Sequence, residues 1–199
     1  MSAAAARRRH YHVGNVRAQL LAAARELLEE QGASALSLRA IAERAGVAPG
    51  TVYYHYADKH ALLAGLAVDG FNELADAMRR AFEAEKAQGG LRATGLAYLA
   101  FLREKPALYE LMFEELDIGR REDVIAAEQA CRQVSADSIL YDFGPYHSPE
   151  TAREMCEAIW AWGRGIAAVS LPRAGSQAGP LGPEMESAVR GLTALISRR

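Results

Sequence analysis

"LSLRAIAERAGVAPGTVYYHYADKHALL", residues Leu36–Leu63, is the stretch that decides the fold of this chain. Apolar positions at helical spacing follow Ser37, a residue type whose side-chain oxygen caps helix N-termini. Gly46 ends this short helix, because glycine readily adopts the left-handed backbone that a tight turn needs. Pro49 fits the first turn of the next helix, where a backbone N–H has no partner within the helix. The stretch therefore predicts two short helices joined by a turn, a helix-turn-helix.

The rest of the sequence is helical in pattern, and no segment has the alternation typical of a β-strand. We predict an all-α protein with a small N-terminal unit and a larger helical remainder. Ile41 and Val52 are expected to supply the core between the two short helices, and breaks are expected at Gln88–Gly90 and Lys105–Pro106. The longer predicted helices cover residues 13–31, 59–86, about 121–141, 149–171 and 184–197.

The net charge of −2 hides an uneven distribution. Residues 1–60 contain eight lysines and arginines and five acidic residues, whereas the remainder contains 15 and 20. A basic N-terminal part on an acidic body indicates an anionic partner at one end, and nucleic acid is the first candidate. Residues 1–12, which include Arg7, Arg8 and Arg9, are expected to form a flexible basic arm along a groove or the backbone of the nucleic acid.

Several classes of protein are not expected. No apolar run reaches the roughly 18–20 residues of a membrane span, and the apolar stretch of a signal peptide does not follow the N-terminal arginines. The sequence contains no Gly-rich phosphate loop, nucleophile elbow or metal-ligand cluster, so we expect neither an enzyme nor a cofactor or metal site. Cys131 and Cys156 are expected to be reduced, buried thiols of a cytoplasmic protein, with a redox switch as the alternative.

The words Ile-Ala, Ala-Gly-Val and Gly-Thr-Val-Tyr, with a further aromatic residue and a lysine ahead of Leu-Leu, resemble the N-terminal signature of the TetR family of bacterial transcription regulators. The resemblance covers about residues 13–82. It implies that residues 13–59 form a DNA-binding domain, linked through helix 59–86 to an effector-binding and dimerisation domain, residues 60–199. The sequence departs from the family at Ala48, where a Ser, Thr or Asp usually caps the second short helix.

The resemblance also implies a role in DNA binding for nine residues. Their chemistry is suitable. Arginine donates two hydrogen bonds to guanine, a proline ring or a threonine methyl group packs on the thymine methyl group, and hydroxyls bond phosphate oxygens. Taken alone, Tyr53 fits the core as well as DNA, Tyr56 fits the core, and Arg17, Arg25 and Arg44 fit solvated helix faces. The residues matched to phosphate contacts are Ser37, Tyr54, His55 and Lys59; those matched to base edges or the adjoining backbone are Arg39, Pro49, Gly50, Thr51 and Tyr53.

The C-terminal part resembles one TetR subgroup in "FLREKPALYELMF" and "AIWAWGRGIAAV". That subgroup has a tryptophan four residues before a His-Gly pair, whereas here Trp160 precedes Arg164-Gly165. The resemblance implies an effector pocket and a homodimer formed by the last two helices. Ordinary core packing is the alternative for every aromatic candidate. The candidate pocket residues are Tyr98, Phe101, Tyr109, Met112, Phe113, Tyr141, Trp160 and Trp162; the candidate dimer residues, one stripe of the last helix, are Met185, Ala188, Leu192 and Leu195.

These observations together predict a cytoplasmic, homodimeric DNA-binding regulator without catalytic activity. The resemblance implies a repressor that binds a palindromic double-stranded operator and is released from it by a small-molecule effector. Two alternatives remain open at this point. One is a DNA-binding regulator that has no effector or activates transcription; the other is an all-α interaction module or enzyme with a vestigial DNA-binding head.

Overall fold

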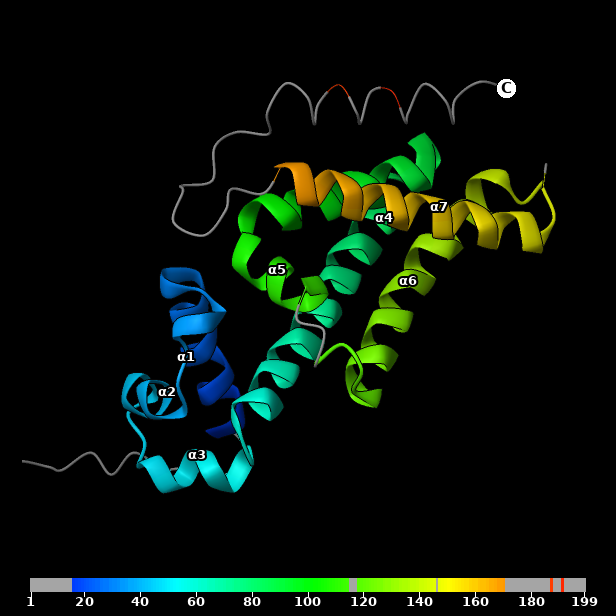
Figure 1. Ribbon diagram of the computed structural model, residues 1–199. Helices are drawn as coiled ribbons and strands as arrows, with labels where there is room; N and C mark the ends of the chain where they lie inside the picture. The colour runs from blue at the N-terminus through cyan, green and yellow to red at the C-terminus, as the bar shows by residue number, and fades with distance from the viewer. Residues whose placement is uncertain (1–15, 115–117, 146, 171–186, 188–190, 192–199) are drawn as a thin grey trace, which may run out of the picture. The chain divides into compact units, whose positions relative to one another are not determined.

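A computed structural model of the chain describes residues 16–114, 118–145, 147–170, 187 and 191 (Figure 1). The described residues form helices and connecting turns without a strand, which confirms the predicted all-α class. The chain folds as two units, residues 1–62 and 63–199. Of the predicted last helix, 184–197, the structure describes only residues 187 and 191, both of them helical. The elements are α1 (Val16–Gln31), the 3-10 turn η1 (Ala33–Ala35), α2 (Leu38–Ala45), α3 (Pro49–His55), α4 (Lys59–Glu104), α5 (Pro106–Glu114), α6 (Glu122–Phe143) and α7 (Pro149–Ser170).

The N-terminal unit is built around the turn between α2 and α3, which run in different directions (Figure 1). The Ser37 hydroxyl caps α2 by accepting a hydrogen bond from the Ala40 N–H at 3.1 Å. Gly46 ends α2 with φ 67° and ψ 32°, the left-handed conformation that favours glycine. Ile41 and Val52 are fully buried, as predicted. The local signals for this motif are therefore confirmed.

The start and end of α3 differ in how they are fixed. Ala48 precedes the helix and offers no side-chain cap, so Pro49 alone sets the first turn. Tyr56 follows the last residue of α3 and is buried, with the Arg17 guanidinium 5.7 Å from its ring centre. Asp58 then caps α4, because its Oδ1 accepts a hydrogen bond from the Ala61 N–H at 2.7 Å. The predicted core role of Tyr56 is confirmed.

The element α4 comprises two helical segments, because its helical backbone is interrupted at Gly89 (φ 128°, ψ 104°), which confirms the predicted break at Gln88–Gly90. Beyond this break, one carboxylate holds the two N–H groups that begin the helix again. Asp142 of α6 accepts from the Gly90 N–H through Oδ1 at 2.9 Å and from the Leu91 N–H through Oδ2 at 2.8 Å. The side chain of α6 thus serves as the cap for the second half of α4.

Buried hydroxyls continue this contact between α4 and α6. The Thr94 and Ser138 hydroxyls lie 3.1 Å apart, and both residues are almost fully buried. The Ser138 hydroxyl also donates to the Ser135 carbonyl at 2.7 Å. Because each hydroxyl has a partner, this polar contact is compatible with the apolar core around it.

Replacing Asp142 by alanine is expected to lower the free energy of unfolding by roughly 1–3 kcal/mol, since two partly buried N–H groups lose their acceptor. Urea unfolding followed by circular dichroism measures this loss. Asp137→Ala is the matched control, because Asp137 lies on the same helix and is exposed, accepting a hydrogen bond from Gln133 of its own helix. Equal stability of the Asp142 and Asp137 variants would contradict the capping role.

The core of the second unit is aliphatic and aromatic. Its largest fully buried side chains include Phe71, Leu74, Leu102 and Leu108. Gly70 lets α5 pack closely on α4, because a Cβ atom there would lie 2.6 Å from the Met112 sulfur. No helix among the described residues has the length and apolar character needed to cross a membrane.

Candidate functional site

The tyrosines around α3 divide between the surface and the core. Tyr53 is 61% exposed and Tyr54 is 83% exposed, whereas Val52 and Tyr56 are buried. Tyr54 contacts His55 edge to face, with ring centres 5.2 Å apart. The sequence left Tyr53 between core and surface, and the structure places it at the surface. One side of α3 therefore presents two large aromatic side chains to solvent.

The other candidate DNA-binding residues belong to the same stretch of the N-terminal unit. Ser37 and Arg39 are exposed at the start of α2, and Pro49 and Gly50 are exposed at the start of α3. The Lys59 ammonium at the start of α4 donates to the Ser34 carbonyl at 3.3 Å, which leaves donors for a further ligand. Thr51, His55 and Lys59 are half-buried.

Arg44 was expected to lie on a solvated helix face, but two carboxylates hold its side chain in place. Its guanidinium bonds both carboxylate oxygens of Glu30, at 2.9 and 2.7 Å, and Glu26 at 3.2 Å. The hydrogen bond from Arg44 lowers the pKa of the Glu30 carboxyl. Arg44 thus ties α2 to α1, whereas Arg39 on the same helix forms no ion pair with a described residue. The i, i+4 spacing of the two glutamates on α1 is the signal that sequence reasoning missed.

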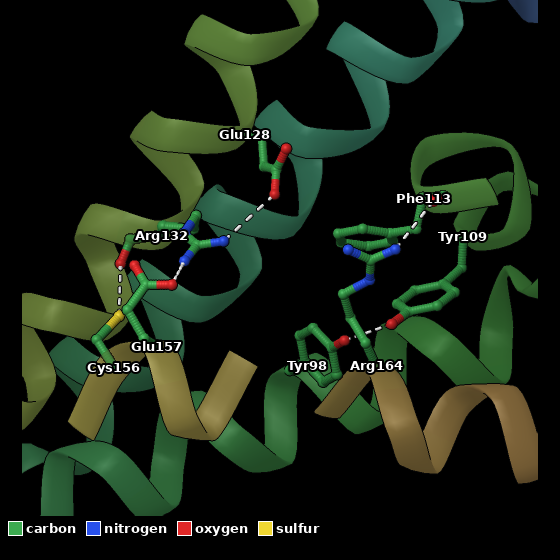
Figure 2. A network of polar contacts seen from close by, with 8 residues as sticks. All are labelled: Tyr98, Tyr109, Phe113, Glu128, Arg132, Cys156, Glu157 and Arg164. Atoms are coloured by element: carbon green, nitrogen blue, oxygen red, sulfur yellow. Dashed lines mark hydrogen bonds and ion pairs between the residues drawn. The ribbon is translucent and has the colours of Figure 1, made fainter. Parts of the chain in front are cut away.

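In the second unit, five aromatic side chains from three helices form a contiguous aromatic cluster: Phe71, Tyr98, Tyr109, Phe113 and Trp160. The Phe113 ring centre lies 5.1 Å from Phe71, 4.6 Å from Tyr109 and 5.9 Å from Trp160. Tyr98 lies 5.8 Å from both Tyr109 and Trp160, in edge-to-face contacts. The Tyr98 and Tyr109 hydroxyls are hydrogen-bonded to each other (Figure 2).

Arg132 of α6 covers one side of this aromatic cluster. Its guanidinium lies 5.3 Å from the Trp160 ring centre. Figure 2 shows its ion pairs with Glu128 on α6 and Glu157 on α7. The Cys156 thiol donates to the Arg132 carbonyl at 3.7 Å. The positive charge of Arg132 is therefore balanced by two carboxylates.

Arg164 of α7 covers the other side and has a different kind of partner. Its guanidinium lies 5.4 Å from the Phe113 ring centre and donates to the Phe113 carbonyl at 3.2 Å (Figure 2). Burial raises the pKa of the Tyr98 hydroxyl, so this phenol is neutral. Gly163 allows Tyr98 to pack on α7, because a Cβ atom there would lie 3.2 Å from its ring.

The two cysteines are buried thiols, as expected. Burial raises the pKa of the Cys131 thiol to about 12, and it also raises the pKa of Cys156. The nucleophilic and oxidisable form of cysteine is the thiolate, and burial disfavours it here. These properties favour a packing role over a redox switch.

Both units match known families. Residues 20–66 match "Bacterial regulatory proteins, tetR family". Residues 91–195, more than half of the chain, match "Tetracyclin repressor-like, C-terminal domain". The chain belongs to the TetR family. TetR proteins are transcription regulators that bind DNA through a helix-turn-helix and are not enzymes, so the predicted class of protein is confirmed.

Individual relatives agree with this assignment. The uncharacterized HTH-type transcriptional regulator YobS of Bacillus subtilis (strain 168) is 26% identical over 119 residues, which are 60% of this chain and 62% of that protein. This TetR chain thus matches less than two thirds of the relative's length. A protein of unknown function from Rhodococcus sp. RHA1 is 28% identical, with a TM-score of 0.70 over 92% of this chain and 98% of that one. The multidrug binding protein EbrR, complexed with imidazole, is 23% identical, with a TM-score of 0.61 over 90% of this chain and 88% of that one.

The residues that the TetR resemblance matched to an effector pocket do not all meet. Tyr98, Tyr109, Phe113 and Trp160 belong to the aromatic cluster, whereas Tyr141 is 52% exposed and contacts Phe82. The remaining candidates are Phe101, buried under the Lys105 ammonium, Met112, buried against Gly70, and Trp162, which is half-buried.

Other predictions from the TetR resemblance fall on residues that the structure does not describe. The basic arm, residues 1–12, and the candidate dimer residues Met185, Ala188, Leu192 and Leu195 lie outside the described residues. The resemblance to the Trp-His-Gly subgroup also stays a prediction. Arg164, which the structure describes, stands in the place of the histidine of that subgroup.

Proposed function

We propose that this TetR-family protein is a cytoplasmic homodimeric repressor that binds a palindromic double-stranded DNA operator and is released by a small-molecule effector. The observation that carries the DNA-binding half of the proposal is the exposure of Tyr53 and Tyr54 on α3. Large aromatic side chains at the surface of a basic unit need a partner, and a helix of this size enters a major groove. The neighbouring exposed residues are of the types that bond DNA.

The candidate DNA-binding residues fall into the two sets that the TetR resemblance implies. Ser37, Tyr54, His55 and Lys59 carry hydroxyl, imidazole and ammonium donors suited to phosphate oxygens. Arg39 at the start of α2 and Tyr53 on α3 are long side chains that reach base edges. The base-reading set is completed by three small residues at the start of α3, the exposed Pro49 and Gly50 and the half-buried Thr51.

The regulatory half of the proposal concerns the second unit. A dimer places two copies of α3 on two half-sites, about one helical turn or a multiple of it apart. An effector that binds better to the arrangement unable to span both half-sites releases the operator. The fold-level likeness to EbrR, which is named as a multidrug binding protein and carries imidazole, supports a ligand-binding role for this fold.

A footprint on genomic DNA fragments, followed by a salt titration, tests the proposal. Protection of a palindrome is expected, with affinity falling linearly in log salt by a slope of about −0.9 for each phosphate contact. A vestigial head would instead protect no palindrome even at low salt. The dissociation of the bound operator by small molecules is then measured on the same fragment, which separates an effector-free regulator from the proposed one.

A further inference from the structure

Within the described part of the second unit, one buried side-chain polar group has no hydrogen-bond partner. The Trp160 side chain is only 4% exposed, and its indole Nε1–H meets no hydrogen-bond acceptor among the described residues. Buried N–H groups are nearly always hydrogen-bonded. A buried donor without an acceptor loses its hydrogen bonds to water, and this free-energy cost exceeds the net gain of a typical hydrogen bond. The indole N–H of Trp160 therefore calls for an acceptor that the described residues do not supply, and a bound ligand is one source of it.

The surroundings of Trp160 favour an acceptor of particular chemistry. Tyr98 and Phe113 contact its ring with centres 5.8 and 5.9 Å away, so the neighbours of the indole are aromatic edges and faces. A flat aromatic molecule suits such neighbours, because aromatic rings attract one another in edge-to-face and offset arrangements. The acceptor for the Trp160 indole N–H is thus best carried on an aromatic ring.

The charge beside the aromatic cluster favours an anion. Arg132 is balanced by Glu128 and Glu157, but Arg164 forms no ion pair with a described carboxylate and donates instead to a neutral carbonyl. Arg164 and Trp160 both lie within 6 Å of the Phe113 ring centre, so a ligand the size of one or two rings reaches both. A carboxylate has two oxygens that accept from an indole N–H and a guanidinium.

We infer that the effector is a small aromatic carboxylate that binds at the aromatic cluster, where its oxygens accept hydrogen bonds from Trp160 Nε1 and the Arg164 guanidinium. This inference rests on the proposed effector-controlled function. Arg164 also holds the Phe113 carbonyl near the end of α5, so a carboxylate that competes for the guanidinium loosens the tie between α7 and α5. Recognition of the ligand and a change in helix packing then share one residue.

Titration calorimetry on the full-length protein tests the inference, with 2-naphthoate as the probe and neutral 2-naphthamide as its matched analogue. The unmodified protein should bind 2-naphthoate at least tenfold more tightly than 2-naphthamide. Trp160→Phe keeps the ring and removes the N–H, and should weaken 2-naphthoate at least tenfold. Arg164→Gln should bring the two probes to similar affinity. Arg153→Gln, at an exposed position of the same helix, is the control and should change neither affinity.

A second measurement does not depend on the folding of the variants. The chain has two tryptophans, so its ¹H–¹⁵N spectrum contains two indole N–H signals, which Trp162→Phe assigns. Added 2-naphthoate should move the Trp160 signal downfield and leave that of Trp162 nearly in place. Absent binding, an unmoved Trp160 signal, or equal affinity of Trp160→Phe overturns the inference. If the protein still binds operator DNA in that case, the DNA-binding function stands and only the ligand class is wrong. If the protein binds no operator DNA, the proposed function itself is refuted.

Discussion

Arg39→Ala is expected to weaken operator binding by roughly 1–3 kcal/mol for each half-site and to relax the preference for one base pair there. Arg39 is exposed at the start of α2, while Arg44 on the same helix is held by Glu26 and Glu30. Arg39 is thus the arginine of α2 that is free to reach a base. Binding of operators with single base changes, measured by gel shift, gives the preference at each position.

Lys59→Ala is the matched comparison for this experiment. The Lys59 ammonium contacts the Ser34 carbonyl and is proposed to hold a phosphate, which carries no sequence information. Its loss should weaken all operators alike and reduce the salt slope by about one per protomer. If Arg39→Ala and Lys59→Ala both lowered affinity uniformly, the division into base-reading and phosphate-holding residues would be wrong.

Tyr56→Ala should destabilise the N-terminal unit by roughly 3–5 kcal/mol, the cost of removing a large buried aromatic side chain. Tyr56 is buried between the end of α3 and the start of α4, and its ring lies under the Arg17 guanidinium. The unit is small, so a loss of this size is a large part of its stability. Hydrogen exchange of the α2 and α3 amides should accelerate, and operator binding should fail with it.

Tyr54→Ala provides the contrast within the same segment. Tyr54 is 83% exposed, so its removal should change the stability by no more than about 0.5 kcal/mol. Operator affinity should nevertheless decrease, because a proposed phosphate contact is lost from each half-site. A Tyr54→Ala variant that unfolds like Tyr56→Ala would show that the tyrosines do not divide between surface and core in this way.

Local chemistry accounts for what could be predicted from sequence. Ser37, Gly46 and Asp58 act on backbone groups within four residues of themselves, so residue type and position were sufficient to predict the two caps and the turn. Tyr56 could be assigned to the core from its place after α3. Tyr53 could not be assigned, because an amphipathic ring suits core and surface equally.

The parts that sequence reasoning missed depend on residues far apart in the chain. Arg44 meets Glu26 and Glu30 across 18 and 14 residues; the i, i+4 spacing of the glutamates marks one face of α1 but does not show that Arg44 packs against it. The same holds for the aromatic cluster. The resemblance gave Tyr98, Trp160 and Tyr141 alike as candidates. Only the packing of the helices shows that Tyr98 meets Trp160, whereas Tyr141 of α6 contacts Phe82 of α4.

The carboxylate of Asp142 has a consequence for the order in which the second unit folds. The break at Gly89 separates the two halves of α4, so the second half cannot simply propagate from the first and must nucleate again. The groups that start it are held by a side chain 52 residues away. The second half of α4 therefore gains this cap only when α6 has closed this long loop, so the stabilities of the two segments are coupled.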